Sequence, residues 1–314
     1  MLYRKIKLLG SGSYGYVYLA QNIKTLKKYA IKKILLNNTT YDSCINEIKI
    51  MTKIKSPYII EVYDYFKIKN YLYIVMEYAP YGDLYSYIQG RKNKNKSISY
   101  RSIKYVMCSI SKGLRDLHRN NIIHRDIKPC NILICKGNKI KIADFGISRI
   151  VEGRHQMIYT KIGTPYYMSP EVLNGYRYSY SIDHWGLGCI FYELLTLKRP
   201  FESNNLLNLY YKIKMGKYNI KILPTEYIYI IKGLLNKSPL LRFNEREILD
   251  FYNDQSSYNI KVGFNVYSRT NIKLPKININ DSLEKKVRSK YVLDNFNGRR
   301  YNKKVSKLPN INKY

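Results

Sequence analysis

Two short segments of the chain carry the residue types that transfer of a phosphoryl group requires. They are His124-Arg125-Asp126-Ile127-Lys128-Pro129-Cys130-Asn131 and, thirteen residues after Asn131, Asp144-Phe145-Gly146. Asp126 can orient a hydroxyl nucleophile and accept its proton, while Lys128 can neutralise charge on the phosphate in transfer. Asn131 and Asp144 offer the hard oxygen ligands that phosphate-bound magnesium prefers. The alternative, two ordinary β-turns with solvated charges, is disfavoured by the tandem pattern.

A glycine-rich turn near the N-terminus could hold phosphates. It reads Gly10-Ser11-Gly12-Ser13-Tyr14-Gly15-Tyr16-Val17. Glycines let the backbone approach a phosphate closely and point N–H groups at it. Such turns are common on their own, and a dinucleotide-binding fold needs a helix after the glycines. Here residues 17–20 continue as a strand, which disfavours that alternative.

A lysine and a glutamate downstream of this turn form a candidate ion pair. Lys32 ends an alternating segment, Tyr29-Ala30-Ile31-Lys32, and Glu47 lies on a predicted helix. A single lysine in such a lysine-rich chain is normally solvated. Paired with Glu47, its ammonium would lie over the α- and β-phosphates of a nucleotide.

The elements that must position these residues divide into a strand-rich part and a helix-rich part. Alternation of apolar and polar residues predicts strands within 2–36, 58–67 and 71–77. Helical spacing predicts helices at 41–55, 83–90, 99–119, 179–197, 204–215 and 224–236, with a solvated loop at Arg91–Lys96. Two lobes are therefore expected, at about 3–77 and 82–250, joined near Glu77–Gly82 and followed by a basic, disordered tail at 251–314.

Length and composition set the class of protein. The 314 residues, of which 45% are hydrophobic, suffice for one bilobal domain and a tail. Five scattered cysteines without a CxxC pair argue for a reducing interior and against a disulfide framework or zinc site, and four widely spread histidines predict no metal cluster. No signal peptide or membrane span is recognised, so we expect an intracellular protein, cytoplasmic or nuclear.

The formal charge of +33 invites a polyanion-binding interpretation. Lysine far outnumbers arginine, and Asn, Ile and Tyr are also abundant, so an AT-rich genome explains the excess more simply. The tail repeats a Lys-Leu-Pro motif at 273–278 and 307–312. This motif could dock a protein partner, although the biased composition explains it equally well.

Taken together, these motifs resemble those of the eukaryotic protein kinase family over residues 3–250. The glycine turn, Lys32, Glu47 and the two segments appear in the family's order, as does Ser169-Pro170-Glu171. Asp183 in Asp183-His184-Trp185-Gly186 looks like the family's buried helix aspartate that supports the catalytic-loop backbone. Arg242 looks like the partner of Glu171.

The resemblance implies a bilobal α+β fold and transfer of the γ-phosphoryl of ATP, with Mg²⁺, to a protein hydroxyl. Asp126 would orient the nucleophile, Asn131 and Asp144 would hold magnesium, and Lys32 and Lys128 would offset phosphate charge. The residues implied to surround the nucleotide, besides the glycine turn, are Val17, Ala30, Met76 as gatekeeper, the backbone of Glu77–Ala79, Asp83 at the ribose, and Leu133. For the apolar ones, ordinary core packing is the compatible alternative.

Lys128 followed by Pro129 is the serine/threonine form of the family's motif. Thr164, in Gly163-Thr164-Pro165, sits where the family places the threonine that contacts Lys128 and Asp126. Arg125 before the base implies control by phosphorylation of the activation loop by an upstream kinase. Thr160 is the first candidate site and Tyr159 the second.

The segments 79–84 and 163–171 look most like those of the NIMA-related kinases. Two departures from the family pattern stand out. Cys130 replaces a glutamate with which basophilic kinases recognise upstream arginines, so no strong requirement for several arginines is expected. Gly186 replaces the usual serine, which we expect to loosen a helix start without affecting the chemistry.

Two rival functions remain open. A pseudokinase scaffold would bind partners without transferring phosphate, although every residue whose loss defines that class is present. A polyanion- or microtubule-binding protein would act through its basic tail, which is compatible with kinase activity. Nucleic acid is not expected to be the main ligand.

Overall fold

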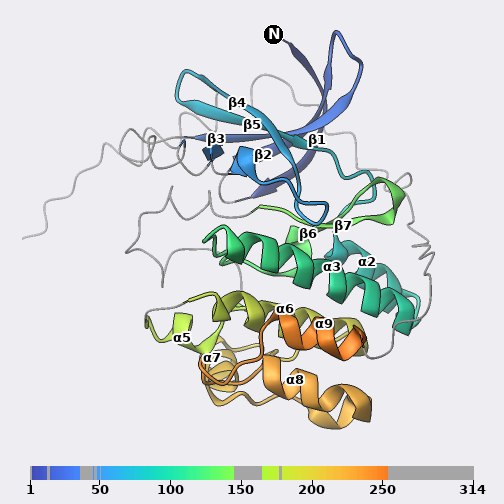
Figure 1. Ribbon diagram of the computed structural model, residues 1–314, viewed down its shortest axis with the longest axis vertical. Coiled ribbons are helices and arrows are strands. Elements are labelled where there is room, and N and C mark those ends of the chain that lie inside the picture. The colour runs from blue at the N-terminus through green and yellow to red at the C-terminus, as the bar shows by residue number, and fades with distance from the viewer. Residues whose placement is uncertain are drawn as a thin grey trace, which may run out of the picture. The chain divides into compact units, whose positions relative to one another are not determined.

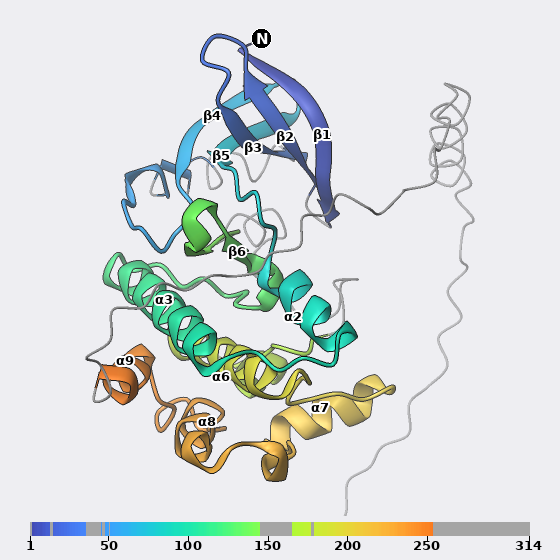
Figure 2. The same ribbon diagram turned by 90° about the vertical axis from the view of Figure 1, so that its right-hand side faces the viewer.

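The computed structural model describes residues 2–12, 15–35, 45, 48–49, 51–144, 165–176 and 179–253. Within these residues, a strand-rich N-terminal lobe precedes a helical C-terminal lobe, as the sequence predicts (Figures 1 and 2). A single connection, residues 78–83, links the last strand of the first lobe to the first helix of the second.

The N-terminal lobe is a five-stranded antiparallel sheet in the order β1-β2-β3-β5-β4. The strands are β1 (Tyr3–Gly12), β2 (Gly15–Asn22), β3 (Lys28–Leu35), β4 (Val62–Ile68) and β5 (Tyr71–Glu77). Leu72 and Ile74 of β5 belong to the main core, whereas Tyr73 between them packs against a second cluster, which contains Val75. This alternation is what the period of two along a strand requires.

The strand predicted at 58–67 begins only at Val62. The residues before it are instead bonded to β7 (Ile140–Ile142): the N–H of Ile142 donates to Tyr58 O at 2.8 Å, and the N–H of Ile60 donates to Ile142 O at 2.8 Å. This segment therefore ties the N-terminal lobe to the C-terminal lobe, a long-range pairing that local alternation does not reveal.

Helical geometry is present at residues 45, 48–49 and 51–53, within the helix predicted at 41–55. Ile48 and Met51 are buried and Ile45 packs against the same core. The spacing of three residues between them places them on one helical face, as the pattern predicts.

The helices of the C-terminal lobe match the predicted ranges to within a few residues, with additions. They are α2 (Leu84–Asn93), α3 (Tyr100–Arg119), α5 (Pro170–Leu173), α6 (Ser181–Thr196), α7 (Leu206–Met215), α8 (Ile228–Leu234) and α9 (Glu245–Asn253). The short helix α5 and α9 were not predicted. In α9, Ile248 and Tyr252 are buried. Packing on the core therefore stabilises this helix, although its short sequence pattern does not indicate one.

Helix α2 extends three residues into the segment predicted to be a loop. Arg91, on its last turn, donates from Nε to Lys96 O at 3.2 Å and from Nη2 to Ser97 O. The prediction of a loop over all of Arg91–Lys96 is therefore wrong for Arg91–Asn93, because these bonds hold the last turn against the chain that follows.

Helix α6 is buried on nearly all sides and lies against α3, which buries one face. A helix that is apolar all round needs such a central place. A small sheet of β6 (Ile132–Ile134) and β7 lies above α3 in Figure 1, and the predicted catalytic residues flank these two strands. Among the described residues, no helix combines the length and the apolar character needed to cross a lipid bilayer.

Candidate active site

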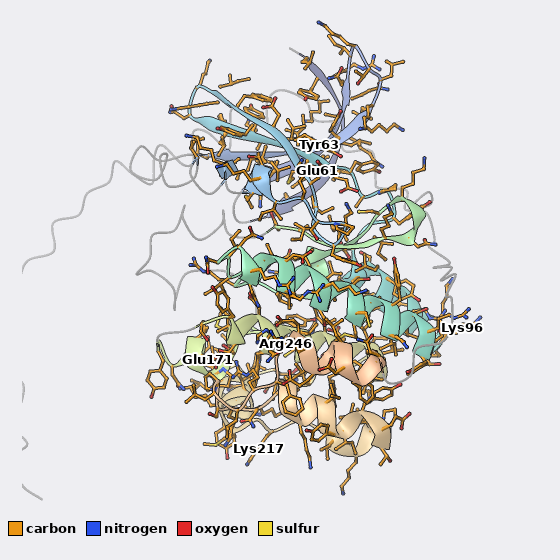
Figure 3. The ribbon with its side chains drawn as sticks, viewed as in Figure 1. Glu61, Tyr63, Lys96, Glu171, Lys217 and Arg246 are labelled. Atoms are coloured by element: carbon orange, nitrogen blue, oxygen red, sulfur yellow. The ribbon has the colours of Figure 1, made fainter. Side chains whose placement is uncertain are left out.

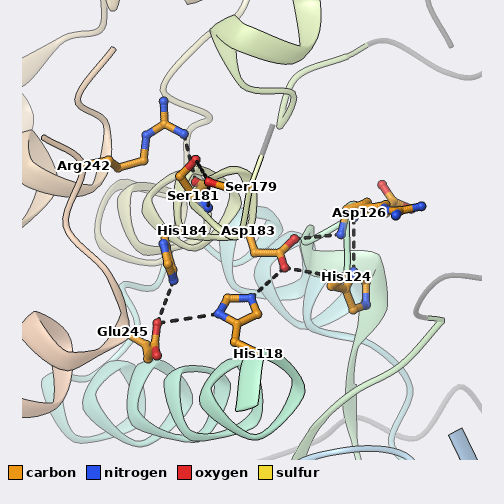
Figure 4. A network of polar contacts seen from close by, with 10 residues as sticks. His118, His124, Asp126, Ser179, Ser181, Asp183, His184, Arg242 and Glu245 are labelled. Atoms are coloured by element: carbon orange, nitrogen blue, oxygen red, sulfur yellow. Dashed lines mark hydrogen bonds and ion pairs between the residues drawn. The ribbon is translucent and has the colours of Figure 1, made fainter. Parts of the chain in front are cut away.

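The catalytic loop, residues 124–131, is held from below by Asp183 on α6. The Asp183 carboxylate accepts the backbone N–H of His124 at 2.8 Å on Oδ2 and that of Arg125 at 2.7 Å on Oδ1 (Figure 4). Arg125 has φ of 71°, a left-handed conformation that costs free energy outside glycine. The two bonds to a buried carboxylate stabilise this bend. The sequence-based expectation that Asp183 supports this backbone matches the geometry.

His124 links the catalytic loop to the segment that bears Asp144. Its Nδ1 accepts the N–H of Asp126 at 3.2 Å, so its Nε2 carries the ring proton and donates to Ala143 O at 2.9 Å. In addition, the N–H of Ala143 donates to Asn131 O at 2.8 Å. The two segments picked out in the sequence are thus joined through hydrogen bonds from both ends of the loop.

Asp126 is positioned by two neighbours within the loop. Asn131 Nδ2 donates to the backbone O of Asp126 at 2.8 Å and to its Oδ2 at 2.9 Å, and Lys128 Nζ lies 2.8 Å from the same Oδ2. Both N–H groups of the Asn131 amide are therefore engaged. Its Oδ1 is the atom that remains to bind a ligand. An amide oxygen of this kind suits a hard divalent cation.

Lys32 of β3 forms an ion pair with Asp144, which follows β7. Loss of hydration raises the pKa of Asp144, but the charge and hydrogen bond of Lys32, with smaller contributions from His124 and Lys128, hold that pKa below its usual value. The carboxylate is therefore ionised at neutral pH, as a metal ligand must be. The structure thus joins two predicted site residues that lie 112 positions apart.

The turn between β1 and β2 depends on Gly15. Its φ is 134°, and a Cβ there would lie 2.0 Å from the backbone O of Lys33 on β3. Only glycine fits so close an approach. A Cβ at Gly10 would instead meet nothing within 4 Å, so the space beside β1 is open at this position.

The predicted adenine-binding residues come together from both lobes. Ala30 pairs with Met76 across β3 and β5, and Val17 pairs with Lys32 across β2 and β3. Met76 and Leu133, from different lobes, pack against one small apolar cluster. The shared cluster provides an apolar floor of the kind that ligand pockets use.

The connection between the lobes carries the other predicted nucleotide contacts. The N–H of Glu77 donates to Glu61 O at 2.9 Å and its side chain binds Lys141 Nζ at 2.6 Å. Ala79 packs against the apolar cluster that contains Leu133. Asp83 caps α2, because its Oδ1 accepts the N–H of Ser86 at 2.7 Å.

A buried ion pair fixes the segment after the activation loop. Glu171, which lies on α5 at the left of Figure 3, receives two parallel hydrogen bonds from Arg242, at 2.6 and 3.0 Å. Arg242 also donates to the backbone O of Ser181 and of Asn236, both at 2.9 Å. The predicted pairing of Glu171 with Arg242 is confirmed, and the guanidinium joins α5 to the start of α6.

Comparison with known proteins agrees with this geometry. The family model for the protein kinase domain matches residues 3–252. The chain belongs to the protein kinase family. In its described residues, the catalytic loop precedes β6, Asp144 follows β7, and Lys32 on β3 pairs with Asp144.

The relatives of this kinase domain are serine/threonine kinases. The serine/threonine-protein kinase PLK4 of Danio rerio is 34% identical over 253 residues, covering 79% of this chain and 27% of its own length. Nek4 of Mus musculus is also 34% identical, over 79% of this chain and 32% of its own. The probable serine/threonine-protein kinase nek2 of Dictyostelium discoideum is 33% identical, over 79% and 62%. The predicted likeness to NIMA-related kinases is confirmed, and the chain spans only about a quarter to three-fifths of these relatives' lengths.

Several predicted residues lie outside the described part of the kinase domain. They are Ser13 and Tyr14 in the glycine turn, the Lys32 partner Glu47, and the loop residues Tyr159, Thr160 and Thr164. Ser11, Gly12 and Gly15 flank that turn at the ends of β1 and β2. The roles of the residues outside the described part stay predictions.

Gly186 has a packing role that the sequence did not predict. A Cβ at this position of α6 would lie 2.6 Å from the backbone O of Ile127 in the catalytic loop. The absent side chain lets α6 approach the catalytic loop, while the expectation that Gly186 loosens the helix start stays a prediction.

The sequence-based exclusion of a metal cluster also fails. His118 and His184 are 66 positions apart, yet one ring nitrogen of each and an oxygen of Glu245 all lie within 4.8 Å of one another. Sequence spacing could not reveal this group, because three separate helices supply its members. This group is distinct from the site at Asp126 and Asp144.

Proposed function

We propose that this chain transfers the γ-phosphoryl group of ATP to serine and threonine hydroxyls of protein substrates. The observation that carries the proposal is the arrangement around Asp126. Its carboxylate is oriented by Asn131 and Lys128, and hydrogen bonds through His124 and Ala143 connect it to the segment that bears the Lys32–Asp144 pair. An oriented base beside charges that can hold phosphate is what phosphoryl transfer needs.

Each of these residues has a distinct task in the proposed reaction. Asp126 aligns the substrate hydroxyl and accepts its proton as the oxygen attacks phosphorus. Lys128, beside that carboxylate, offsets the charge of the phosphoryl group in transfer. Lys32 leaves its pairing with Asp144, in whole or in part, to meet the phosphates of the nucleotide.

The donor set fits a magnesium ion bound with the nucleotide. Asn131 keeps its Oδ1 for a ligand and Asp144 is ionised, and both are hard oxygen donors. Mg²⁺ held there would screen the β- and γ-phosphates. Gly10, Ser11, Gly12, Ser13, Tyr14 and Gly15 would cover those phosphates, while Val17, Ala30, Met76, Glu77, Ala79, Asp83 and Leu133 would surround the nucleoside.

Replacement of the base tests the proposal. Asp126→Asn keeps an oxygen that can accept the Asn131 bond but cannot take up a proton. We expect transfer of radiolabel from ATP to a serine/threonine peptide mixture to fall about 10²–10⁴-fold, while ATP binding persists. Asp250→Asn, at an exposed position of α9, is the matched control and should retain full transfer.

Two results would contradict the proposal. Wild-type protein that binds ATP without transferring label would favour the pseudokinase scaffold. Equal transfer by wild type and Asp126→Asn would show that Asp126 is not the base. Phosphoamino-acid analysis of the products checks the acceptor class, for which the sequence at Lys128 and the names of the relatives favour serine and threonine.

Substrate selection should not depend on several upstream arginines. Cys130 is exposed, and its pKa is raised by desolvation and then by the nearby Asp83, so it stays an uncharged thiol at neutral pH. Asp83 supplies a carboxylate, one oxygen of which is already committed to capping α2. A peptide array that showed a strict requirement for two or more basic residues would refute this expectation.

Regulation by phosphorylation of the activation loop is part of the proposal. Arg125 precedes the base, and a dianionic phosphate on Thr160 could pair with a guanidinium and order the loop, with Thr164 contacting Lys128 and Asp126. Loss of activity in Thr160→Ala and its retention in Thr160→Glu would support this control. An unaffected Thr160→Ala would refute it.

We also propose that the protein works in a reducing compartment, the cytoplasm or the nucleus, on protein substrates. Four cysteines of the described residues, Cys108, Cys130, Cys135 and Cys189, are free thiols, which suits such a compartment. The basic tail is a candidate docking segment for a protein partner. Binding to microtubules or polyanions that survives deletion of 252–314 would exclude the tail as the cause.

A further inference from the structure

Three potential metal ligands converge where α3, α6 and α9 meet, below the catalytic loop (Figure 4). His118 lies on the last turn of α3, His184 on the first turn of α6, and Glu245 begins α9. Their side chains are 9%, 8% and 13% exposed. Two imidazoles and one carboxylate are a ligand set that binds zinc and related divalent transition metals.

The hydrogen bond from His118 to Asp183 fixes which ring nitrogen faces the cluster. His118 Nε2 lies 2.9 Å from Asp183 Oδ2, and because a carboxylate only accepts, Nε2 carries the proton. The other ring nitrogen, Nδ1, is then the one that faces Glu245, and it is the atom that can bind a cation. A carboxylate that orients a ligating histidine in this way is the usual support of a zinc-bound imidazole.

The distances between the two ring nitrogens and the Glu245 oxygen are suited to a cation bound between them. His118 Nδ1 is 3.9 Å from Glu245 Oε2, too far for a hydrogen bond, while His184 Nε2 is 2.7 Å from the same oxygen. Bonds of about 2.0–2.2 Å at tetrahedral angles would place neighbouring ligand atoms about 3.4 Å apart. The observed distances lie on either side of this value, so small side-chain rotations would complete the geometry.

Rigid elements hold the three side chains in place. The start of α9 is fixed by reciprocal bonds: Asn244 Oδ1 accepts the N–H of Arg246 at 2.8 Å, and Glu247 Oε2 accepts the N–H of Asn244 at 2.9 Å. The rings of His118 and His184 are 5.2 Å apart, edge to face. Sites built on rigid helices lose little entropy when they bind a metal.

We propose that His118 Nδ1, His184 Nε2 and Glu245 bind one divalent transition-metal cation of the zinc class, with water as the fourth ligand. The cation takes the place of the proton that His184 Nε2 now shares with Glu245, and that proton passes to Nδ1 of the same ring or to water. The bound cation ties α9 to α3 and α6. The site is linked to the catalytic loop through Asp183, which bonds both His118 and the backbone of that loop.

Calorimetric titration of the metal-free full-length chain with ZnCl₂, in excess Mg²⁺ to occupy oxygen sites, tests the proposal. We expect one saturable Zn²⁺ site, a rise in melting temperature with Zn²⁺, and visible absorption bands of four-coordinate Co²⁺ when cobalt replaces zinc. His184→Gln and Glu245→Gln should each weaken Zn²⁺ binding at least tenfold. Cys130→Ser, which removes an exposed thiol outside the cluster, should bind as the wild type does.

The titration can also overturn the proposal. No saturable Zn²⁺ uptake by the wild type would do so, as would equal affinity in the wild type and both ligand variants. Loss of binding in Cys130→Ser would assign the metal to a thiol instead. Melting temperatures measured with a chelator establish that each variant is folded. If a variant is unfolded, the Co²⁺ spectrum of the wild type decides whether a four-coordinate metal site is present.

Discussion

The carboxylate of Asp183 accepts the backbone N–H of Arg125 at 2.7 Å, at the point where Arg125 adopts a φ of 71°. Asp183 also accepts the N–H of His124 and the Nε2–H of His118, so three donors share one buried carboxylate. Hydrogen bonds therefore hold the backbone bend next to Asp126 against helix α6. Two of the three donors are backbone N–H groups, which need a hydrogen-bond partner when they are buried.

Asp183→Asn should loosen the catalytic loop. An amide offers one oxygen, and its NH₂ would face a backbone N–H, so at least one of the three donors loses its partner. Each orphaned buried donor costs about 1–3 kcal/mol. We expect a lower free energy of unfolding in urea and at least a tenfold loss of phosphate transfer.

Asp116→Asn on α3 is the control for this substitution, because the Asp116 carboxylate accepts the hydroxyl of Ser56 at 2.6 Å, a bond that an amide oxygen can also accept. Equal stability and activity in Asp183→Asn and the wild type would contradict the role assigned to Asp183.

Gly186→Ala should push α6 away from the catalytic loop. Alanine normally stabilises a helix by about 0.5–1 kcal/mol relative to glycine. Here the added Cβ would lie 2.6 Å from the backbone O of Ile127, an atom that cannot move without shifting the loop. We therefore expect both the melting temperature and phosphate transfer to decrease.

The matched control is Gly90→Ala in α2, where a Cβ meets nothing within 4 Å and helix propensity alone should act. A melting temperature that rises in both variants would show that α6 and the catalytic loop tolerate a side chain at Gly186.

Breaking the Glu171–Arg242 pair should be costly. Both side chains are almost fully buried, so Arg242→Met leaves the Glu171 carboxylate without its charged partner. Such a loss costs about 3–5 kcal/mol. The double variant Glu171→Leu/Arg242→Met should lose less stability than the sum of the single variants, measured by urea unfolding.

Lys55→Met is the comparison for an exposed ion pair. Lys55 binds Glu61 at 2.6 Å with its side chain 68% exposed, and Glu61 lies beside Tyr63 in the upper lobe (Figure 3). We expect a change within about 1 kcal/mol for this pair. If the stability losses of Glu171→Leu and Arg242→Met simply added in the double variant, the proposed energetic coupling between these two side chains would be contradicted.

The buried carboxyl of Glu193 should make stability depend on pH. Burial raises the pKa of Glu193 above its usual value of 4.5, and the bond from Tyr167 and the charge of Arg199 only partly oppose this. The folded chain thus holds this proton more tightly than the unfolded chain. The resulting stabilisation is complete below the unfolded pKa and is lost as pH rises through the folded pKa.

Glu193→Gln removes this titration while keeping an oxygen for the Tyr167 hydroxyl. We expect the melting temperature of the variant relative to the wild type to increase between about pH 4 and pH 8. Glu226→Gln, at an exposed position, is the matched control. A relative melting temperature of Glu193→Gln that falls as pH rises would contradict the expected direction.

Local pattern was sufficient to predict most elements and to group the residues of the candidate site. The alternation along β5 and the spacing of Ile45 and Ile48 report burial directly, because each element must turn one face to the core. The residues from His124 to Asn131 are close in sequence, so their chemistry could be inferred together. The late start of β4 and the existence of α9 were missed, because both depend on contacts with β7 and α3 that a local window does not contain.

The sequence by itself determined which residue types the candidate site holds: carboxylates at Asp126 and Asp144, an amide at Asn131, and lysines at positions 32 and 128. Only the tertiary structure decided how these groups are held, through the Asp183 bonds and the close approach of Gly186 to Ile127. It alone brought His118 and His184 to Glu245. Residue type fixes what a side chain can do, whereas its partners depend on which distant helices the burial of apolar surface packs together.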